Sequence, residues 1–414
     1  MESDLDFKNR DPYDFYARKL ADGPVHWDHG MNAWLVVGYD ESRFVMTREE
    51  LFGHPYNDFR GAVEVQGGSR GILLLQGAEH DAMHNFLLSW FKPAVVKKYA
   101  DELIRPLVMR RLDEIGTRNL VDLDAHFAGK LPSDVIAALL GLDWHDEELL
   151  ANCREWNHSI FAWSETFGED ENALHEALDA AAKLEGILMP VIRARKEQPQ
   201  DDMISMLWEK GPSVLSPWGE AEVMAQCRVL LFAGSDTTAH LLRNAIFVLA
   251  NRPELQDELR GDRARIQDFV DEVLRYYAPV HFRVRVALAD VDLSGVTIKK
   301  GDRVHPMNAA GNRDERHYPN PNEIDIDRKP LRDHLAFSVG PRFCVGAALA
   351  RGEALEAIEL LLNRMSSICW DGTAEPARIF GHMPRSHKPL NVAVTRGVPA
   401  LNVEATFPVN VTIT

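Results

Sequence analysis

Residues 334–350 read HLAFSVGPRFCVGAALA and hold Cys344, one of four cysteines in a chain of 414 residues. Gly340 and Pro341 predict a turn before the cysteine, and the Ala- and Leu-rich residues after it predict a helix. Backbone N–H groups and the dipole at a helix start favour a thiolate. The sulfur is therefore a candidate for redox chemistry or metal ligation, beside simple burial, which is the usual fate of a lone cysteine.

Two neighbours of the cysteine favour a flat, anionic ligand. Gly346 carries no side chain, so such a ligand can approach the backbone closely. Arg342 is placed to pair with a carboxylate such as a haem propionate. A thiolate that ligates haem iron donates electron density and favours cleavage of an O–O bond.

The other cysteines, Cys153, Cys227 and Cys369, form no CxxC pair, so zinc-ribbon and simple iron–sulfur spacings are absent. A net charge of −17 argues against nucleic-acid binding and against docking on anionic membranes. The N-terminal residues are charged and show no signal peptide. We expect a cytoplasmic protein.

Residues 229–250 form the most apolar long stretch, but Asp236, His240 and Arg243 interrupt it, so a buried helix is expected rather than a membrane span. Ser216 is the expected N-cap of this long helix, with Pro217 as its first residue. A helix of this length is expected to cross the interior of the protein.

The pattern of apolar residues predicts a mainly α fold with a small β portion. One domain is expected over residues 1–414, because no repeat or linker divides the chain. The β-containing parts are expected near residues 25–60, 283–306 and 374–412, and the helical part mainly over residues 80–275 and 345–364.

The long helix contains AGSDTT, residues 233–238, where an acid and two hydroxyl groups interrupt an apolar run. Burying such groups without partners is costly. Thr237 is expected to donate a hydrogen bond to the carbonyl of Ala233 and to help open a bend. Asp236 and Thr237 then form a candidate proton-delivery pair. On this hexamer alone, a hydrated helix kink without chemistry is the simpler interpretation.

EVLR places Glu272 and Arg275 on one helical face, a pairing that is common and weak on solvated helices. Arg328, in DIDR, adds a second guanidinium if the irregular segment before it folds back over the helix. A buried cluster of these three residues would be structural, because it leaves no charge without a partner.

Taken together, these motifs resemble the cytochrome P-450 superfamily, in its soluble bacterial form, over nearly the whole chain. The haem-loop pattern of that family, Phe-Gly-x-Gly-x-(His/Arg)-x-Cys-x-Gly, is met by Phe337, Ser338, Gly340, Arg342, Cys344 and Gly346. AGSDTT is similar to its oxygen-activating helix motif, and EVLR to its ExxR motif. NRDERHYPNPNEIDIDR, ending at Arg328, is similar to the meander before the haem loop. Four motifs in this order are far more specific than any one of them.

The resemblance implies a cytochrome P-450 fold whose long helix crosses over haem b, with Cys344 as the axial thiolate ligand. Ala233 and Gly234 are expected to lie against the haem. His334 and Arg285 match propionate partners of the family, and GAEHDAMH supplies His80 and His84 to the same face. The family has an Arg where this chain has His84, and a Gly where it has Ser338.

The implied function is that of a monooxygenase that activates dioxygen with two electrons and hydroxylates or O-dealkylates a small to medium apolar substrate. Aromatic and terpenoid compounds are the candidate substrates. The chain has no spare length for a flavin domain and no GxGxxG that opens a helix, so no bound flavin is expected. A separate ferredoxin and its reductase, supplied by NAD(P)H, are the expected donors to a monomer. Lys92, Lys97 and Lys98 are candidates for docking the donor.

The resemblance also suggests where the substrate binds. The expected segments are residues 52–75, 161–192, 229–233, 280–282 and 380–385. Within them, the candidate pocket residues are Phe161, Val229, Phe232, Val280 and Phe282. Ordinary core packing is the alternative for each.

Two other functions remain open. One is a haem-thiolate enzyme of another type, a peroxygenase or an isomerase or dehydratase, which has less need of Asp236 and Thr237. The other is a haem-binding protein without turnover, which needs no electron donor.

Overall fold

The computed structural model describes residues 11–381 and 383–396. Its longer helices are α1 (Tyr13–Asp22), α2 (Tyr39–Thr47), α4 (Gly77–Trp90), α5 (Pro93–Tyr99), α6 (Arg105–Ile115), α7 (Leu131–Leu139), α8 (Glu147–Glu165), α9 (Glu171–Glu197), α10 (Met203–Val214), α11 (Glu220–Asn251), α12 (Pro253–Leu259), α13 (Arg263–Tyr276) and α15 (Ala347–Arg364). Short turns of helix are α3 (Ala62–Val65), α14 (Asn308–Gly311), η1 (Pro55–Asp58), η2 (Ala100–Ile104), η3 (Asp124–Ala128), η4 (Leu335–Phe337) and η5 (Gly340–Arg342).

The strands among the described residues form four small sheets. The largest has the order β1-β2-β8-β5-β3, from β1 (Val25–Asp28), β2 (Ala33–Val36), β8 (Arg303–Pro306), β5 (Arg285–Ala287) and β3 (Phe52–Gly53). The second has the order β4-β12-β9, from β4 (Leu120–Asp122), β12 (Asn391–Arg396) and β9 (Met365–Trp370). Two hairpins complete the set, β6 (Val291–Leu293) with β7 (Val296–Ile298), and β10 (Arg378–Phe380) with β11 (Ser386–Lys388).

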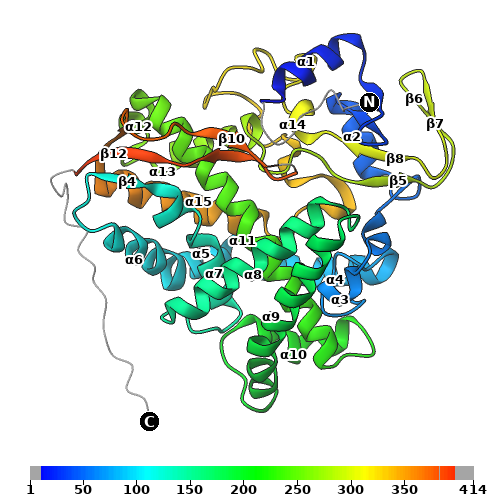
Figure 1. Ribbon diagram of the computed structural model, residues 1–414, viewed down its shortest axis with the longest axis horizontal. Helices are drawn as coiled ribbons and strands as arrows, with labels where there is room; N and C mark the ends of the chain where they lie inside the picture. Colours follow the sequence, from blue (N-terminus) through cyan, green and yellow to red (C-terminus); the bar gives the residue numbers. More distant parts are fainter. Residues whose placement is uncertain (1–10, 382, 397–414) are drawn as a thin grey trace.

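The mainly α fold with a small β portion is as predicted, and Figure 1 shows most helices gathered below and beside the strands. The strand β4 lies within the segment expected to be helical. Part of the β-containing segment expected over residues 374–412 falls on residues 397–412, which lie outside the described residues. The domain range 1–414 likewise stays a prediction.

Helix α11 runs through the middle of the molecule (Figure 1), and most of its 32 residues are buried. A helix that is apolar nearly all round must lie inside the core. It begins at Glu220 after an N-cap at Gly219, so the prediction of an N-cap at Ser216 was wrong. The indole of Trp218 packs over Gly211 of α10, which holds the preceding residues in the connection between the two helices.

Aspartates cap four of the helices around α11. Asp146, Asp170, Asp202 and Asp262 each accept a backbone N–H in the first turn of the helix that follows. Such caps satisfy donors that the helix itself leaves unpaired. Within the described ranges, no helix is long and apolar enough to cross a membrane.

Candidate active site

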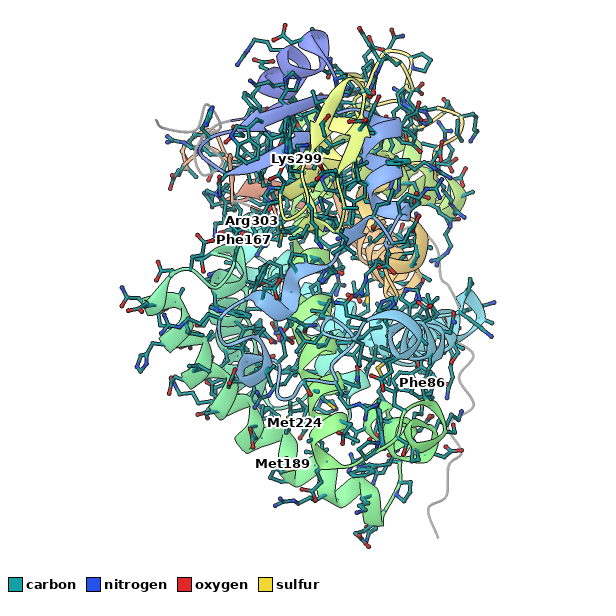
Figure 2. All side chains as sticks on the ribbon, turned by 90° about the vertical axis from the view of Figure 1, so that its right-hand side faces the viewer. Phe86, Phe167, Met189, Met224, Lys299 and Arg303 are labelled. Carbon is teal, nitrogen blue, oxygen red and sulfur yellow. The ribbon has the colours of Figure 1, made fainter. Side chains whose placement is uncertain are left out.

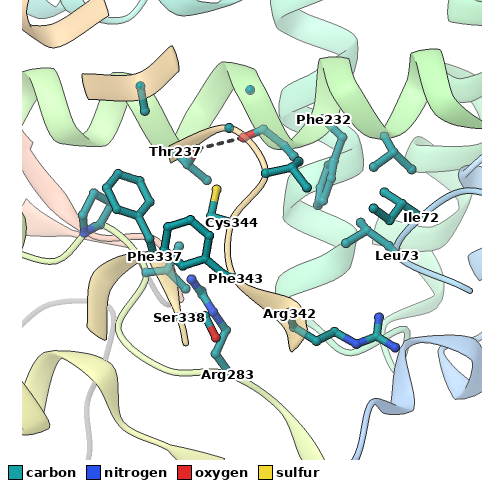
Figure 3. A pocket seen from close by; sticks show the side chains of 18 of the residues that line it. Ile72, Leu73, Phe232, Thr237, Arg283, Phe337, Ser338, Arg342, Phe343 and Cys344 are labelled. Carbon is teal, nitrogen blue, oxygen red and sulfur yellow. Dashed lines mark hydrogen bonds between the residues drawn. The ribbon is translucent and has the colours of Figure 1, made fainter. Parts of the chain in front are cut away.

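A cavity of about 330 Å³ lies between α11 and the loop that carries Cys344. Thr237 reaches it from α11, and Cys344 reaches it from the opposite side, with the sulfur directed toward α11 (Figure 3). Ala233, Gly234, Phe337 and Gly346 also line it. Gly340 is outside this lining.

A backbone hydrogen bond fixes the shape of the loop that carries Cys344. The Cys344 N–H donates to the carbonyl of Phe337 over 2.9 Å. Burial raises the pKa of the Cys344 thiol, although the backbone at Gly346 and the charge of Arg283 oppose this. The expected preference for a thiolate is therefore outweighed by burial in the protein alone. A metal cation at the sulfur would reverse this balance.

Ser338 stands where the family pattern has glycine. Its φ is +61°, the left-handed region that a glycine adopts most easily. The side chain is buried, and its hydroxyl lies 3.4 Å from the Met46 sulfur. The serine therefore retains the backbone shape of the glycine, at the cost of local strain.

Three arginines surround the lower part of the cavity. Arg342 and Arg285 were predicted, and Arg283 was missed. Burial lowers the pKa of both Arg283 and Arg285 to about 10. The Nε of Arg285 is buried and makes no hydrogen bond among the described atoms. Positive groups of this kind suit the carboxylates of a haem.

The alternation in RVR contained the signal for Arg283. Successive side chains of an extended segment point to opposite faces, so positions 283 and 285 share one face. The guanidinium of Arg283 also donates to the Ala336 carbonyl over 3.2 Å. Arg342 already has a protein partner, because its Nε lies 2.6 Å from Oε1 of Glu49.

His334 is not where the resemblance placed it. It lies outside the cavity lining and its Nε2 is 3.4 Å from Oδ1 of Asp271 on α13. Although burial opposes the effect, His334 and Arg351 lower the pKa of Asp271 to about 2. The carboxylate of Asp271 thus holds the imidazole outside the cavity lining, and the propionate contact that the resemblance implied finds no support here.

His80 and His84 both line the cavity, with ring centroids 5.3 Å apart. His84 Nε2 lies 2.6 Å from the Phe343 carbonyl oxygen. Because a carbonyl can only accept, the imidazole N–H is the donor. His84 is thus bonded to the peptide that precedes Cys344.

The predicted acid–alcohol pair is divided between two faces of α11. Thr237 lines the cavity, and its Oγ1 donates to the Ala233 carbonyl over 2.8 Å, as expected. Helix α11 nevertheless continues from Glu220 to Asn251 as one helix, so this bond does not interrupt it. Asp236 lies outside the lining, and its Oδ2 is 4.0 Å from Nδ1 of His158 on α8. Burial raises the pKa of Asp236, and His158 opposes this.

The expected structural cluster is present below the site. Arg275 pairs with both carboxylate oxygens of Glu272, over 2.8 and 2.7 Å, and both side chains are fully buried. Arg328 Nε lies 3.3 Å from Glu272 Oε1. Both arginines also donate to carbonyls of the irregular segment, including that of Glu323. The cluster holds that segment against α13.

The upper part of the cavity is apolar and aromatic. Phe161 and Phe232 stack with ring centroids 4.8 Å apart, and Val229 and Val280 line the same cavity. Phe282 is fully buried outside the lining, stacked on His305 at 5.0 Å, so it is core and not pocket. The predicted segments also contribute lining residues that had not been singled out: Tyr56, Phe59, Ile72, Leu73, Phe167 and Met383.

Glu353 on α15 is a lining residue that the sequence did not indicate. It is 1% exposed, and its Oε2 has no hydrogen-bond partner among the described atoms. Burial raises its pKa well above the usual value. Burial of a carboxyl group without a partner thus favours its neutral form.

Comparison with known proteins identifies the architecture. A family model described as Cytochrome P450 matches residues 16–383. The chain is 31% identical to a biotin biosynthesis cytochrome P450 of Bacillus subtilis, with 87% of this chain and 90% of that protein covered. It is also 31% identical to the cytochrome P450 monooxygenase PikC of Streptomyces venezuelae, with 94% and 92% covered.

Solved structures agree. The crystal structure of P450BioI, in complex with an acyl carrier protein ligated to hexadec-9Z-enoic acid, has a TM-score of 0.83 and 30% identity, with 93% of this chain and 99% of that chain covered. CYP109E1 of Bacillus megaterium, in complex with testosterone, has a TM-score of 0.80 and 26% identity, with 93% and 99% covered. Since sequence and fold match together over most of the chain, the protein belongs to the cytochrome P450 family of haem-thiolate monooxygenases.

Proposed function

We propose that this chain holds haem b through Cys344 and oxidises a small to medium apolar substrate that binds free in the cavity, by hydroxylation or O-dealkylation. The carrying observation is the placement of Cys344 and Thr237 on opposite sides of one cavity whose upper part is apolar. When bound, the haem supplies dioxygen binding and the oxidation chemistry.

The residues of the chain have separate tasks in this proposal. Arg283, Arg285 and Arg342 neutralise the haem carboxylates. Thr237 presents a hydroxyl to the cavity from the side opposite Cys344, where dioxygen would bind. Asp236 supplies protons from the face of α11 that meets His158. The stacked Phe161 and Phe232 hold the substrate and exclude water.

A free substrate is favoured over one on an anionic carrier. The guanidinium groups near the apolar end are already paired with carboxylates: Arg60 with Glu171, Arg303 with Glu169, and Arg70 with Glu79, over 2.7–2.8 Å. With a net charge of −17, this pairing leaves little positive charge to attract such a carrier. We therefore do not propose an acyl carrier protein, such as the one in the P450BioI structure, as a partner of this chain.

Electrons are proposed to come from a ferredoxin and its reductase, to a monomer in the cytoplasm without a flavin of its own. Lys92 and Lys97 are exposed and remain candidates for docking the donor. Lys98 is a weaker candidate, because its Nζ lies 2.8 Å from Asp201 and 3.7 Å from Glu102. A peroxygenase, an isomerase or dehydratase, and a non-catalytic haem protein remain the alternatives. Asp236 and Thr237 count against the first two, and NADH consumption with a donor system separates an oxygenase from the third.

The test is a spectral titration of the ferric protein with methoxy-aromatics, aromatic acids, terpenoids, fatty acids and testosterone. A compound that enters the cavity and displaces water from the haem is expected to shift the Soret band. It should then be oxidised when NAD(P)H, a surrogate ferredoxin and its reductase are added. Turnover with hydrogen peroxide alone, or no turnover at all, would favour the alternatives.

Cys344→Ser tests the ligand itself. We expect this variant to lose the thiolate signature of the reduced carbon monoxide complex. Cys369→Ser is the matched control, since Cys369 is exposed on β9. An unchanged carbon monoxide spectrum in Cys344→Ser would contradict the assignment.

A further inference from the structure

Residues 66–71, with the sequence QGGSRG, form a segment that we call the glycine strap, and it lies directly on α11. Gly67 has a φ of +78°, and a Cβ added to it would lie 2.8 Å from Cδ of Arg228. A Cβ added to Gly71 would lie 3.0 Å from Cγ2 of Val229. The absence of side chains therefore allows the backbone of the strap to contact α11.

Arg228 of α11 joins this part of the chain to two other helices. Its side chain is 3% exposed, and its Nη1 donates to the carbonyls of Glu64 over 3.0 Å and Val65 over 3.3 Å. These carbonyls belong to the last turn of α3, where no later turn of the helix can donate to them, and that of Glu64 also accepts the N–H of Gly67 over 3.2 Å. Its Nη2 donates to the Ala181 carbonyl of α9 over 2.8 Å.

The position of the guanidinium is strongly determined. Burial lowers the pKa of Arg228, and Glu185, whose Oε2 lies 2.8 Å from Nη2, opposes this. A buried cation that loses its acceptors is costly, so the carbonyls of α3 and α9 are held at fixed places around it. A planar group with five N–H donors can join several backbones at once, which an ammonium group cannot do as well.

Gln226, one half-turn earlier on α11, extends the same connection. It is fully buried, its Nε2 donates to the Arg70 carbonyl over 2.6 Å, and its Oε1 accepts the N–H of Ile72 over 3.3 Å. Ile72 and Leu73 line the apolar part of the cavity and stand beside Phe232 in Figure 3. The buried polar contacts of α11 thus end at the wall that a substrate touches.

The helices concerned lie in the half of the molecule away from the largest sheet. Figure 2 shows Met189 of α9 and Met224 of α11 close together there, and the two helices pack on each other. Neither Arg228 nor Gln226 is among the described residues that line the cavity. The strap links both side chains to the lining residues Ile72 and Leu73, since Gln226 bonds to Arg70 and Ile72 and Arg228 packs against Gly67.

We propose that Arg228 and Gln226 are positioning residues that set the distance of the wall at residues 72–73 from the haem, and thereby select the shape of the substrate. This inference rests on the proposed function, since it concerns the cavity of that same site. Loss of the connection leaves haem binding intact and loosens only the wall.

The experiment compares two azoles on the ferric holoenzyme. Imidazole ligates haem iron and is too small to need the wall, whereas 4-phenylimidazole places its phenyl ring in the apolar part of the cavity. In Arg228→Met, we expect the Kd of 4-phenylimidazole to rise at least tenfold, and that of imidazole to change less than twofold. A merely destabilised protein would change both constants alike.

Three further variants complete the design. Glu185→Gln is the matched control, since Glu185 is 55% exposed and its loss leaves the carbonyl contacts of Arg228 in place. It should behave like the wild type. Gly67→Ala adds a methyl group that collides with Arg228, so it should displace the strap and give the same azole constants as Arg228→Met. It replaces Arg228→Met as the test if that variant does not fold. Arg228→Lys should restore part of the affinity for 4-phenylimidazole.

Hydrogen exchange of the purified proteins provides a measurement that needs no ligand. Exchange of residues 62–73 should be faster in Arg228→Met and Gly67→Ala than in Glu185→Gln. The inference would be overturned if the ratio of the Kd of 4-phenylimidazole to that of imidazole were the same in all variants and hydrogen exchange of residues 62–73 were unchanged. A wild-type protein that binds no haem would instead overturn the proposed function, and hydrogen exchange would still decide whether Arg228 holds the strap.

Discussion

The imidazole of His84 donates a hydrogen bond to the carbonyl oxygen of Phe343, over 2.6 Å, and so joins α4 to the peptide that precedes the proposed thiolate ligand. The family has an Arg where this chain has His84, and the resemblance implied that position 84 faces a haem carboxylate. The shorter imidazole instead binds the backbone of the cysteine loop directly.

His84→Arg is expected to retain haem and activity, because a guanidinium can also donate to the Phe343 carbonyl. His84→Leu removes the donor to the Phe343 carbonyl, a hydrogen bond that contributes about 1 kcal/mol to the stability of this contact. We expect it to give a smaller thiolate-ligated fraction in the reduced carbon monoxide spectrum. His84→Gln, which keeps an N–H donor, is the control. Loss of haem incorporation in His84→Arg would show that the assignment of this position is wrong.

Thr237→Ala is expected to separate electron consumption from product formation. The variant should still oxidise NAD(P)H with the donor system, but at least tenfold less of it should appear in product, and hydrogen peroxide should account for the difference. A positioned proton donor commonly contributes a factor of about 10²–10⁴. Thr237→Ser keeps the hydroxyl and should remain coupled. Unchanged coupling in Thr237→Ala would remove this residue from proton delivery.

The motifs around Cys344 and Thr237 and the Glu272–Arg275 pair could be predicted because each is local, and neighbours within a few residues decide its shape. The bond from Thr237 to Ala233 follows from helical spacing alone. The position of His334 could not be predicted in this way. Its partner Asp271 is 63 residues earlier and on another helix, and spacing does not show which carboxylate will compete for an imidazole.

The two faces of α11 show the same limit. Asp236 and Thr237 are adjacent in sequence and were predicted as one pair, but successive helical residues point in different directions. One therefore meets the cavity and the other meets His158 of α8. Phe282 lies in the core for a similar reason. The alternation of its extended segment directs it toward His305 and away from the cavity.

Arg275→Met tests the buried ion pair with Glu272. Both side chains are fully buried, so the substitution leaves the Glu272 carboxylate charged without its main partner. The expected loss is about 3–5 kcal/mol of the free energy of unfolding, which should be measured by urea denaturation. Arg265→Met is a suitable control, because its carboxylate partner Asp327 is exposed. A loss below 1 kcal/mol in Arg275→Met would mean that the pair is not structurally important.

His158→Ala tests the outer end of proton delivery. The charge of His158 lowers the pKa of Asp236, which burial raises. Removal of the imidazole should therefore raise the pKa of Asp236 further. The acidic limb of kcat against pH should then move to higher pH, because the carboxylate is protonated earlier as the pH falls. His175→Ala, an exposed histidine on α9, should leave the profile unchanged. A shift to lower pH would contradict this model.

His387 makes the stability of the fold sensitive to acid. Burial, aided by Arg385 and Arg313, lowers its pKa to about 3, and its Nδ1 lies 2.9 Å from Oδ1 of Asn244. The unfolded chain binds a proton at this histidine below about pH 6.5, whereas the folded chain does not until the pH approaches 3. Stability is therefore complete above pH 6.5 and falls as the pH decreases toward 3.

The contribution of this one residue to that fall approaches 1.4 kcal/mol per pH unit where the two states differ by a full proton. His387→Gln keeps a side chain that can donate to Asn244 and does not titrate. Urea denaturation at pH 7, 6 and 5 should therefore show a shallower loss of stability in His387→Gln than in the wild type. His281, whose pKa burial also lowers, should leave part of the slope in place. The exposed His175→Gln should keep the slope of the wild type, and an equal slope in His387→Gln would show that His387 is not the residue responsible.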